Sequence, residues 1–283
     1  MSKSGIVMLV LIVVILFIFL ITGLYVYYFF RWKHLWTMDV SISSYEIKSR
    51  VDDTLKVVII GDSWAGMHQE NGMDTYLCSE LQKKVIRPVA VLSKGKGGEK
   101  SKGVYQLMFS PDYYGTKELL AIKPDYCIIS AGINDAAANL GSRQYCHYYR
   151  QMLDFLLTNH IRPIVLEIPD VNIWHLYGEK PIKDLVVDFV RSTMTRCKIY
   201  HFREYREALY QMLINEHLME NIIYVPMKDW NGKSPDIDKS LFMIDQIHLN
   251  RLGYEKLDSC LALAIAKDLE KSSNPNLLNY PMK

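Results

Sequence analysis

Four polar residues that are far apart in the chain are of the types that nucleophilic catalysis uses: Ser63, Asn134, Asp245 and His248. A serine hydroxyl is a weak nucleophile and needs an adjacent base, which His248 can supply. Asp245 precedes His248 by three residues, close enough to bond the other imidazole nitrogen and fix its tautomer. The Asn134 amide is a suitable donor to an oxyanion. These residue types predict attack on an acyl carbonyl, provided that the fold brings them together.

Ser63 follows an apolar run, residues 55–60, through Gly61 and Asp62. The run is rich in β-branched residues, which is typical of a strand buried on both faces of a parallel sheet. Gly61 allows a sharp turn at the end of that strand. Ser63 would then stand at the carboxyl edge of the sheet, where ligands bind in open α/β folds. On this stretch alone, an Asp62 or Ser63 that only caps the next helix is an equally good interpretation.

The rest of the chain alternates short apolar runs with helical patterns, which predicts βαβ units and a parallel sheet. The expected strands are residues 55–60, 88–92, 126–130, 164–168 and 222–225. The expected helices are residues 73–84, 145–159, 183–196 and 203–220, and a last helix begins near Asn250, a good N-cap. The second run opens into a loop rich in lysine and glycine, and Asn134 follows the third run. A glycine N–H from that loop, or the N–H of Ser63, is a further candidate oxyanion donor.

With these motifs in this order, the chain resembles the SGNH (GDSL-like) hydrolases over residues 55–271. Gly61-Asp62-Ser63 is similar to the nucleophile motif of that family, Gly132-Ile133-Asn134-Asp135 to its Gly-x-Asn-Asp motif, and Asp245-x-x-His248 to its terminal motif. The resemblance implies a three-layer α/β/α sandwich of the flavodoxin-like type, with a central parallel sheet of about five strands.

The resemblance also implies roles for single residues. Ser63 would be the nucleophile, His248 the base and Asp245 its partner, and the Ser63 N–H, Gly98 and Asn134 would form the oxyanion hole. Supporting roles are expected for six further residues: Gly61, Asp62, Trp64, Gly97, Gly132 and Asp135. Two positions depart from the family pattern. Trp64 replaces the usual leucine, which puts the shape of the site entrance in doubt, and Gly97 competes with Gly98 as the donor in the lysine-rich loop.

These features predict a serine hydrolase of ester bonds that needs neither a metal nor an organic cofactor. The expected substrate is a small acyl ester, by family habit an O-acetyl group on a cell-envelope glycan. A lipid or lysophospholipid ester is an open alternative, as is acyl transfer to a sugar hydroxyl by the same residues. A non-catalytic binding or scaffold protein with this fold is the hypothesis from another class.

Composition and the remaining motifs exclude other classes of function. A formal net charge of +2 provides no large positive field, so nucleic acid is not an expected partner. The five cysteines have no Cys-x-x-Cys pair, and their odd number leaves at least one unpaired. Residues 95–101 fail the phosphate-binding P-loop pattern, because Glu99 replaces the glycine before the lysine. His68, five residues after Ser63, is a minor candidate for the site.

Residues 6–30 contain no charge and are long enough to span a bilayer. Tyr25, Tyr27, Tyr28, Phe29 and Phe30 end the stretch, as in an interfacial aromatic belt. We therefore expect a tail (1–5), a transmembrane helix (6–30) in contact with lipid, a juxtamembrane linker (31–53), the hydrolase domain (54–271) and a C-terminal tail (272–283). Flanking charges do not decide the side of the membrane, although N-terminal anchors more commonly carry an external domain.

Overall fold

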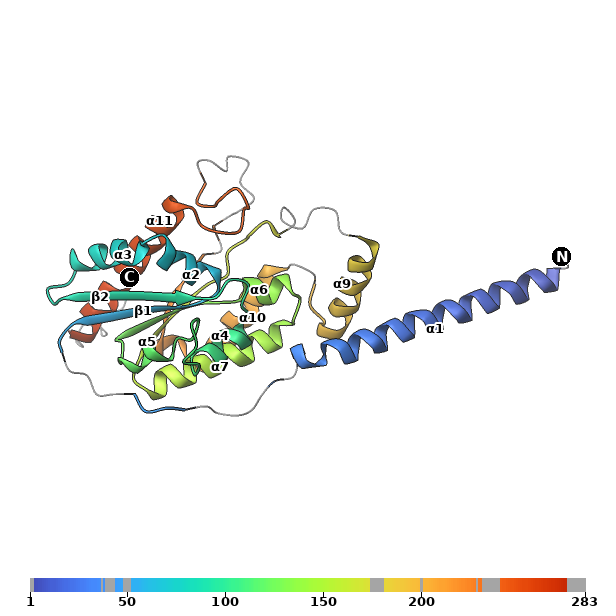
Figure 1. Cartoon of the computed structure of the whole chain (residues 1–283), viewed down its shortest axis with the longest axis horizontal. Coiled ribbons are helices and arrows are strands. Elements are labelled where there is room, and N and C mark those ends of the chain that lie inside the picture. The colour runs from blue at the N-terminus through green and yellow to red at the C-terminus, as the bar shows by residue number, and fades with distance from the viewer. Residues whose placement is uncertain are drawn as a thin grey trace, which may run out of the picture.

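The computed structural model of the chain describes residues 3–36, 38, 44–47, 52–173, 181–198, 201–227, 229–230 and 240–273. Its centre is a five-stranded sheet with the order β2-β1-β3-β4-β5, in which every pairing is parallel. The strands are β1 (Leu55–Gly61), β2 (Val89–Gly95), β3 (Tyr126–Ser130), β4 (Arg162–Leu166) and β5 (Ile223–Val225). Helices cover both faces of the sheet (Figure 1), so the predicted three-layer α/β/α sandwich is confirmed.

The helices divide between the two faces. One face carries α2 (Ser63–Glu70), α3 (Met73–Gln82) and α11 (Arg251–Ser273) (Figure 1). The other carries α4 (Ser101–Leu107), α5 (Lys117–Ala121), α7 (Ser142–Thr158) and α10 (Phe202–Asn215). Two more helices, α6 (Ile133–Ala137) and α9 (Ile182–Thr195), lie beyond the carboxyl ends of the strands. This arrangement leaves that edge of the sheet for the loops that carry the candidate site residues.

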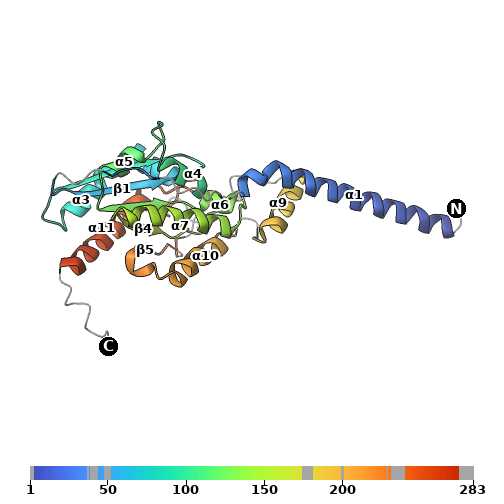
Figure 2. The same ribbon diagram turned by 90° about the horizontal axis from the view of Figure 1, so that it is seen from below.

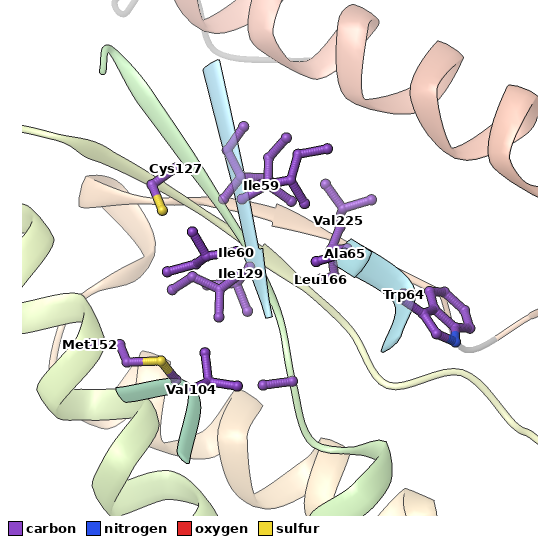
Figure 3. Close-up of a cluster of buried hydrophobic side chains, with 14 of the residues drawn as sticks. Ile59, Ile60, Trp64, Ala65, Val104, Cys127, Ile129, Met152, Leu166 and Val225 are labelled. Atoms are coloured by element: carbon purple, nitrogen blue, oxygen red, sulfur yellow. The ribbon is translucent and has the colours of Figure 1, made fainter. Parts of the chain in front are cut away.

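The strand before Ser63 is buried because it pairs on both sides and is covered on both faces. β1 lies between β2 and β3, and Val58 and Ile60 have no exposed surface. Successive side chains of a strand point to opposite faces. Figure 3 shows Ile60 on the side of Val104 and Met152, whereas Ile59 lies on the opposite side. The apolar run therefore fills both halves of the core and fixes where β1 ends.

Strand and helix ends differ from the predictions by a few residues. β2 continues to Gly95 because Ser93, Lys94 and Gly95 pair with the last residues of β1, although their side chains do not suggest a strand. β4 begins at Arg162, two residues before the predicted start. The predicted helix 203–220 ends early at Asn215, because His217 takes a left-handed conformation (φ 54°) and a short 3₁₀ helix, η1 (Met219–Asn221), follows.

Four short helices were missing from the predicted set of residue ranges: α2, which was considered only as a helix that Asp62 or Ser63 could cap, and α4, α5 and α6. They have 8, 7, 5 and 5 residues, too few for the helical period of hydrophobic residues to be recognised. The last helix does begin where expected, since Asn250 Oδ1 accepts the N–H of Gly253 (2.9 Å). It extends to Ser273, and the remainder of the predicted C-terminal tail lies outside the described residues.

The N-terminal helix α1 (Lys3–Trp36) projects from the sandwich (Figures 1 and 2). Its segment Lys3–Arg31 is long and apolar enough to cross a membrane, and none of its most apolar window is buried by protein. A signal sequence near the N-terminus can pass the same test of length and apolar composition. The helix runs past residue 31 into the predicted linker, part of which lies outside the described residues.

Candidate active site

The turn that carries Ser63 requires a glycine. Gly61 has φ 155°, and a Cβ added there would lie 2.0 Å from the carbonyl oxygen of Ser130 on the neighbouring strand. Asp62 follows as the N-cap of α2, with its carboxylate accepting the N–H of Trp64 (3.1 Å). Ser63 is the first residue of the helix, where N–H groups have no partner within the helix. Asp62 therefore caps the helix that presents Ser63 at the carboxyl end of β1.

Ser63, His248 and Asp245 form a hydrogen-bonded chain. Ser63 Oγ lies 2.8 Å from His248 Nε2, and His248 Nδ1 lies 2.6 Å from Asp245 Oδ2. The expected contact between serine and histidine is thus confirmed. The other oxygen of Asp245 accepts the backbone N–H groups of Ile247 (2.9 Å) and His248 (3.0 Å). Partial burial raises the pKa of Asp245, but the hydrogen bonds from His248 and Ile247 outweigh it, and the net pKa is lowered.

A small closed loop holds Asp245 and His248 in place. Phe242 and Leu249 form an antiparallel bridge, and the Met243 N–H donates to the His248 carbonyl (2.7 Å). Asn250 Nδ2 donates to the carbonyls of Ser240 (2.7 Å) and Phe242 (3.0 Å), which ties the loop to the start of α11. The imidazole is therefore fixed from its backbone as well as through its carboxylate.

Asn134 lies beside the nucleophile turn. Its Nδ2 donates to the Glu99 carbonyl (2.9 Å) and to Asp62 Oδ2 (3.3 Å). Gly98 directly precedes Glu99 and has φ 73°, a conformation that favours glycine, whereas a Cβ at Gly97 would meet open space. Of the two loop glycines, Gly98 is therefore the one whose backbone conformation requires glycine. The bond from Asn134 to the Glu99 carbonyl holds the loop that contains these glycines next to the Asn134 motif.

Two buried carboxylates support this region. Asp62 accepts from Trp64, Ser130 and Asn134, and its burial raises its pKa to about 7 despite these bonds. Asp135 accepts the N–H (2.9 Å) and the hydroxyl (2.5 Å) of Ser101 at the start of α4, and burial raises its pKa to about 6. Asp135 therefore ties the Asn134 motif to the end of the lysine-rich loop. Gly132, the first residue of that motif, has φ 123°, and a Cβ added there would lie 2.5 Å from Ile168 Cδ1.

Trp64, whose effect on the shape of the site entrance the sequence left open, is a buried side chain. It is 3% exposed, and Nε1 donates to the Ile247 carbonyl (3.2 Å). Its ring packs edge-on against Phe242 at 6.3 Å between centroids. The ring is thus buried between α2 and the loop that carries His248 rather than open to solvent. Trp64 therefore braces the loop that carries His248.

His68 belongs to a separate buried cluster. Its Nδ1 lies 2.8 Å from Asp74 Oδ1 and its Nε2 lies 2.9 Å from Asp258 Oδ1, and the hydroxyl of Ser93 bonds the same Asp74 oxygen. Burial lowers the pKa of His68, but the bonds and charges of Asp258 and Asp74 raise it to about 9. The imidazolium joins α2, α3, β2 and α11. No spacing in the sequence indicates this cluster, because its members come from four different elements.

The lysine-rich loop is largely engaged with its own surroundings. Lys96 pairs with Glu99 (2.8 Å), Lys100 donates to the Gly98 carbonyl (3.0 Å), and Lys102 lies over the Tyr148 ring (5.7 Å). These three lysines are therefore held by neighbouring groups of the protein. Ser101 and Ser130, which bond Asp135 and Asp62, are contributors that the motifs did not indicate.

Comparison with known proteins gives a consistent result. The sequence profile described as the GDSL-like Lipase/Acylhydrolase family matches residues 59–256. No functionally curated protein matches the sequence significantly. Among solved structures, the lipase/acylhydrolase from Enterococcus faecalis is 16% identical, with a TM-score of 0.52, and the match covers 75% of this chain and 96% of that one. The psychrotrophic esterase EstA from Pseudoalteromonas is 14% identical, with a TM-score of 0.53 and coverages of 76% and 99%. At such identities these two structures show a shared fold.

Proposed function

This chain belongs to the GDSL-like lipase/acylhydrolase family and is a serine hydrolase that acts on ester bonds, and we propose that Ser63, His248 and Asp245 carry out the reaction. The observation that supports these roles most directly is the 2.8 Å separation of Ser63 Oγ and His248 Nε2, with Asp245 on the other imidazole nitrogen. A serine hydroxyl bonded to a base that is oriented by a carboxylate is the arrangement that activates the nucleophile.

The reaction proceeds in two halves. Ser63 Oγ attacks the acyl carbonyl while His248 Nε2 takes the hydroxyl proton, and the tetrahedral intermediate carries its charge on the former carbonyl oxygen. His248 then gives the proton to the leaving alcohol oxygen as the C–O bond breaks, which leaves an acyl-serine. Water then attacks the acyl-serine while His248 takes its proton, and His248 returns that proton to Ser63 Oγ as the bond to the acyl carbon breaks and the acid is released. Asp245 stabilises the imidazolium in both halves.

We assign the oxyanion hole to the N–H groups of Ser63 and Gly98 and to Asn134 Nδ2. The Ser63 N–H is in the first turn of α2 and is free of the helix's own hydrogen bonding. Asn134 Nδ2 makes a shorter bond to the Glu99 carbonyl (2.9 Å) than to Asp62 (3.3 Å). The proton directed at Asp62 is therefore the one that we expect Asn134 to turn toward the oxyanion.

For the substrate we propose a short-chain acyl ester, most simply an acetyl ester on a glycan near the membrane. Two cavities adjoin the nucleophile turn, but neither is lined by Ser63, Asn134 or His248, so their volumes do not set the length of the acyl chain. The proposal rests on the family to which the chain belongs and on the apolar helix α1 beside the sandwich.

The proposal is tested with the full chain in detergent, using the p-nitrophenyl esters of acetate and of a long fatty acid. Ser63→Ala removes the nucleophile and is expected to lower kcat by about a thousandfold or more. The matched control is Ser79→Ala on the exposed side of α3, which is expected to retain full activity. Equal rates for wild type and Ser63→Ala would overturn the proposed roles. Faster turnover of the fatty ester would overturn the short-chain preference alone.

A further inference from the structure

We propose that α9 (Ile182–Thr195) docks on the lipid membrane surface and immerses an apolar stripe in it. The stripe consists of Ile182, Leu185, Val186 and Phe189, and the spacing of three and four residues puts all of them on one face of the helix. Their side chains are 81%, 50%, 36% and 68% exposed. A contiguous group of large apolar side chains that protein leaves uncovered marks an interaction surface.

The opposite face of α9 packs on the protein, so the stripe is held outward. Val190 is buried, as is Asp188. The Arg191 guanidinium donates to the Ala138 carbonyl (3.3 Å), and the Thr195 hydroxyl donates to Asn139 Oδ1 (3.4 Å). An ordinary surface helix turns its apolar face to the core and its charged face to water. α9 has the reverse orientation, which requires an apolar partner outside the sandwich.

The position of the neighbouring helix α1 indicates that this apolar partner is lipid. α1 contacts α9, and both views show the two helices side by side where α1 joins the sandwich (Figures 1 and 2). The apolar segment of α1 ends in Tyr27, Tyr28, Phe29 and Phe30, followed by Arg31. Aromatic and basic residues at the end of a span lie at the level of the lipid headgroups. A bilayer that contains α1 therefore reaches the level of α9.

The direction and the charges of α9 suit a helix that lies in the plane of a membrane. α9 runs across the line of α1 rather than along it (Figure 1), as expected if α1 crosses the bilayer and α9 rests on it. Lys183 is exposed beside the stripe. Arg143 and Arg196 line an open groove of 550 Å³ next to Met38, which follows α1 closely. Cations at this level would meet lipid phosphates.

Docking of α9 would also orient the site. The carboxyl ends of the strands, and with them the Ser63 turn, lie on the side of the sandwich that faces α1 and α9 (Figure 1). A docked α9 therefore holds this edge toward the bilayer. If the proposed esterase activity is correct, esters at the membrane surface would then be presented to Ser63 more readily than esters in free solution.

Docking is measured by tryptophan quenching, which does not depend on activity. The full chain is reconstituted in phosphatidylcholine vesicles, with and without lipids brominated near the carbonyl end of the acyl chain. Phe189→Trp places a probe in the stripe. The matched control is Tyr113→Trp, which replaces an aromatic residue that is 84% exposed in the loop between α4 and α5. The native tryptophans are common to both variants and cancel in the comparison.

We expect brominated lipid to quench the added tryptophan of Phe189→Trp at least about twofold more than that of Tyr113→Trp. Equal quenching of the two would overturn the proposal. A Phe189→Trp emission that is shifted to the blue but is not quenched, and that depends on the protein-to-lipid ratio, would assign the stripe to a second copy of the chain and would also overturn it. These outcomes can be interpreted even if the esterase test fails, because lipid quenching does not depend on catalytic activity.

Discussion

Asp245 uses its two carboxylate oxygens for two different tasks. Oδ1 accepts two backbone N–H groups and shapes the loop, while Oδ2 bonds His248 Nδ1 at 2.6 Å. The bond to Nδ1 keeps the proton on that nitrogen and leaves Nε2 free to accept the proton of Ser63. Asp245 thus sets both the geometry of the loop and the tautomer of His248. Only the choice of tautomer depends on the negative charge of Asp245.

Asp245→Asn separates the two tasks. The asparagine carbonyl still accepts the backbone N–H groups, but its amide donates toward His248 Nδ1 and forces the proton onto Nε2, where it opposes Ser63. We expect kcat to fall by about 10³- to 10⁴-fold with little change in thermal stability. Steady-state kinetics and a melting curve measure both quantities. The control is Asp112→Asn at an exposed loop position, and more than a tenth of wild-type kcat in Asp245→Asn would contradict the assignment.

Single residues also show where sequence reasoning fails. Ser63, Asn134, Asp245 and His248 could be named because each stands at a motif that ends a strand or begins a helix. The sequence left the effect of Trp64 on the entrance open, because adjacency in sequence does not say which way a helix turns the next side chain. The Ser101–Asp135 bond could not be foreseen, since 34 positions separate the two residues and neither spacing nor composition pairs them.

At the scale of elements, α2 is the helix on which the site depends. Its first residue is Ser63, and its later residue His68 is bonded by Asp74 of α3 and Asp258 of α11. A buried cation between two carboxylates replaces lost hydration with charged hydrogen bonds, and removal of one partner leaves buried charges unpaired. The cluster therefore fixes α2 against the two helices that share its face of the sheet.

This cluster makes a pH-dependent contribution to stability. The pKa of His68 rises from its ordinary value of 6.5 to about 9 in the folded chain, chiefly through Asp258 and Asp74 against the opposing effect of burial. A raised pKa means that the folded state holds the proton more tightly than the unfolded state. The stabilisation, about 3 kcal/mol, is fully present below about pH 6.5 and is lost as the pH rises through about 9.

His68→Gln keeps a hydrogen-bonding side chain but removes the charge. We expect its free energy of unfolding in detergent to be lower than that of wild type at pH 7, and the difference to shrink steadily up to about pH 10. The control, His160→Asn, changes an exposed histidine with φ 57° to a residue that tolerates that conformation. A His68→Gln deficit that stays constant between pH 7 and 10 would show that the imidazole is not charged in the fold.

The whole molecule consists of a sandwich and a projecting apolar helix, and we propose that α1 anchors the enzyme in a membrane. None of the most apolar window of α1 is buried by the part of the chain that the structure describes. In water that apolar surface would drive aggregation, whereas in a bilayer it is covered by the lipid acyl chains. The same helix sets which edge of the sheet faces the membrane, because α9 and the strand ends lie on its side (Figure 1).

Charges in the centre of α1 test the anchor. Leu16→Lys together with Leu20→Lys is expected to raise the free energy of insertion by about 5–7 kcal/mol. The variant should therefore leave the membrane pellet under alkaline carbonate extraction, while wild type stays in it. The matched control is Leu252→Lys with Leu263→Lys on α11, where both leucines are already exposed (56% and 47%). Equal extraction of the two double variants would contradict the anchor.

The sequence by itself determined the parallel sheet, the apolar N-terminal helix and the residues of the proposed catalytic chain. Each of these depends on local information: the period of apolar residues, the length of an uncharged run, or a short motif at the end of a strand. Only the tertiary structure decided how Asn134 meets Glu99 and Asp62, where Trp64 points, what surrounds His68, and that the apolar face of α9 turns outward. These features depend on contacts between residues that are distant in the chain, and such contacts follow from the packing of the helices on the sheet rather than from any local pattern.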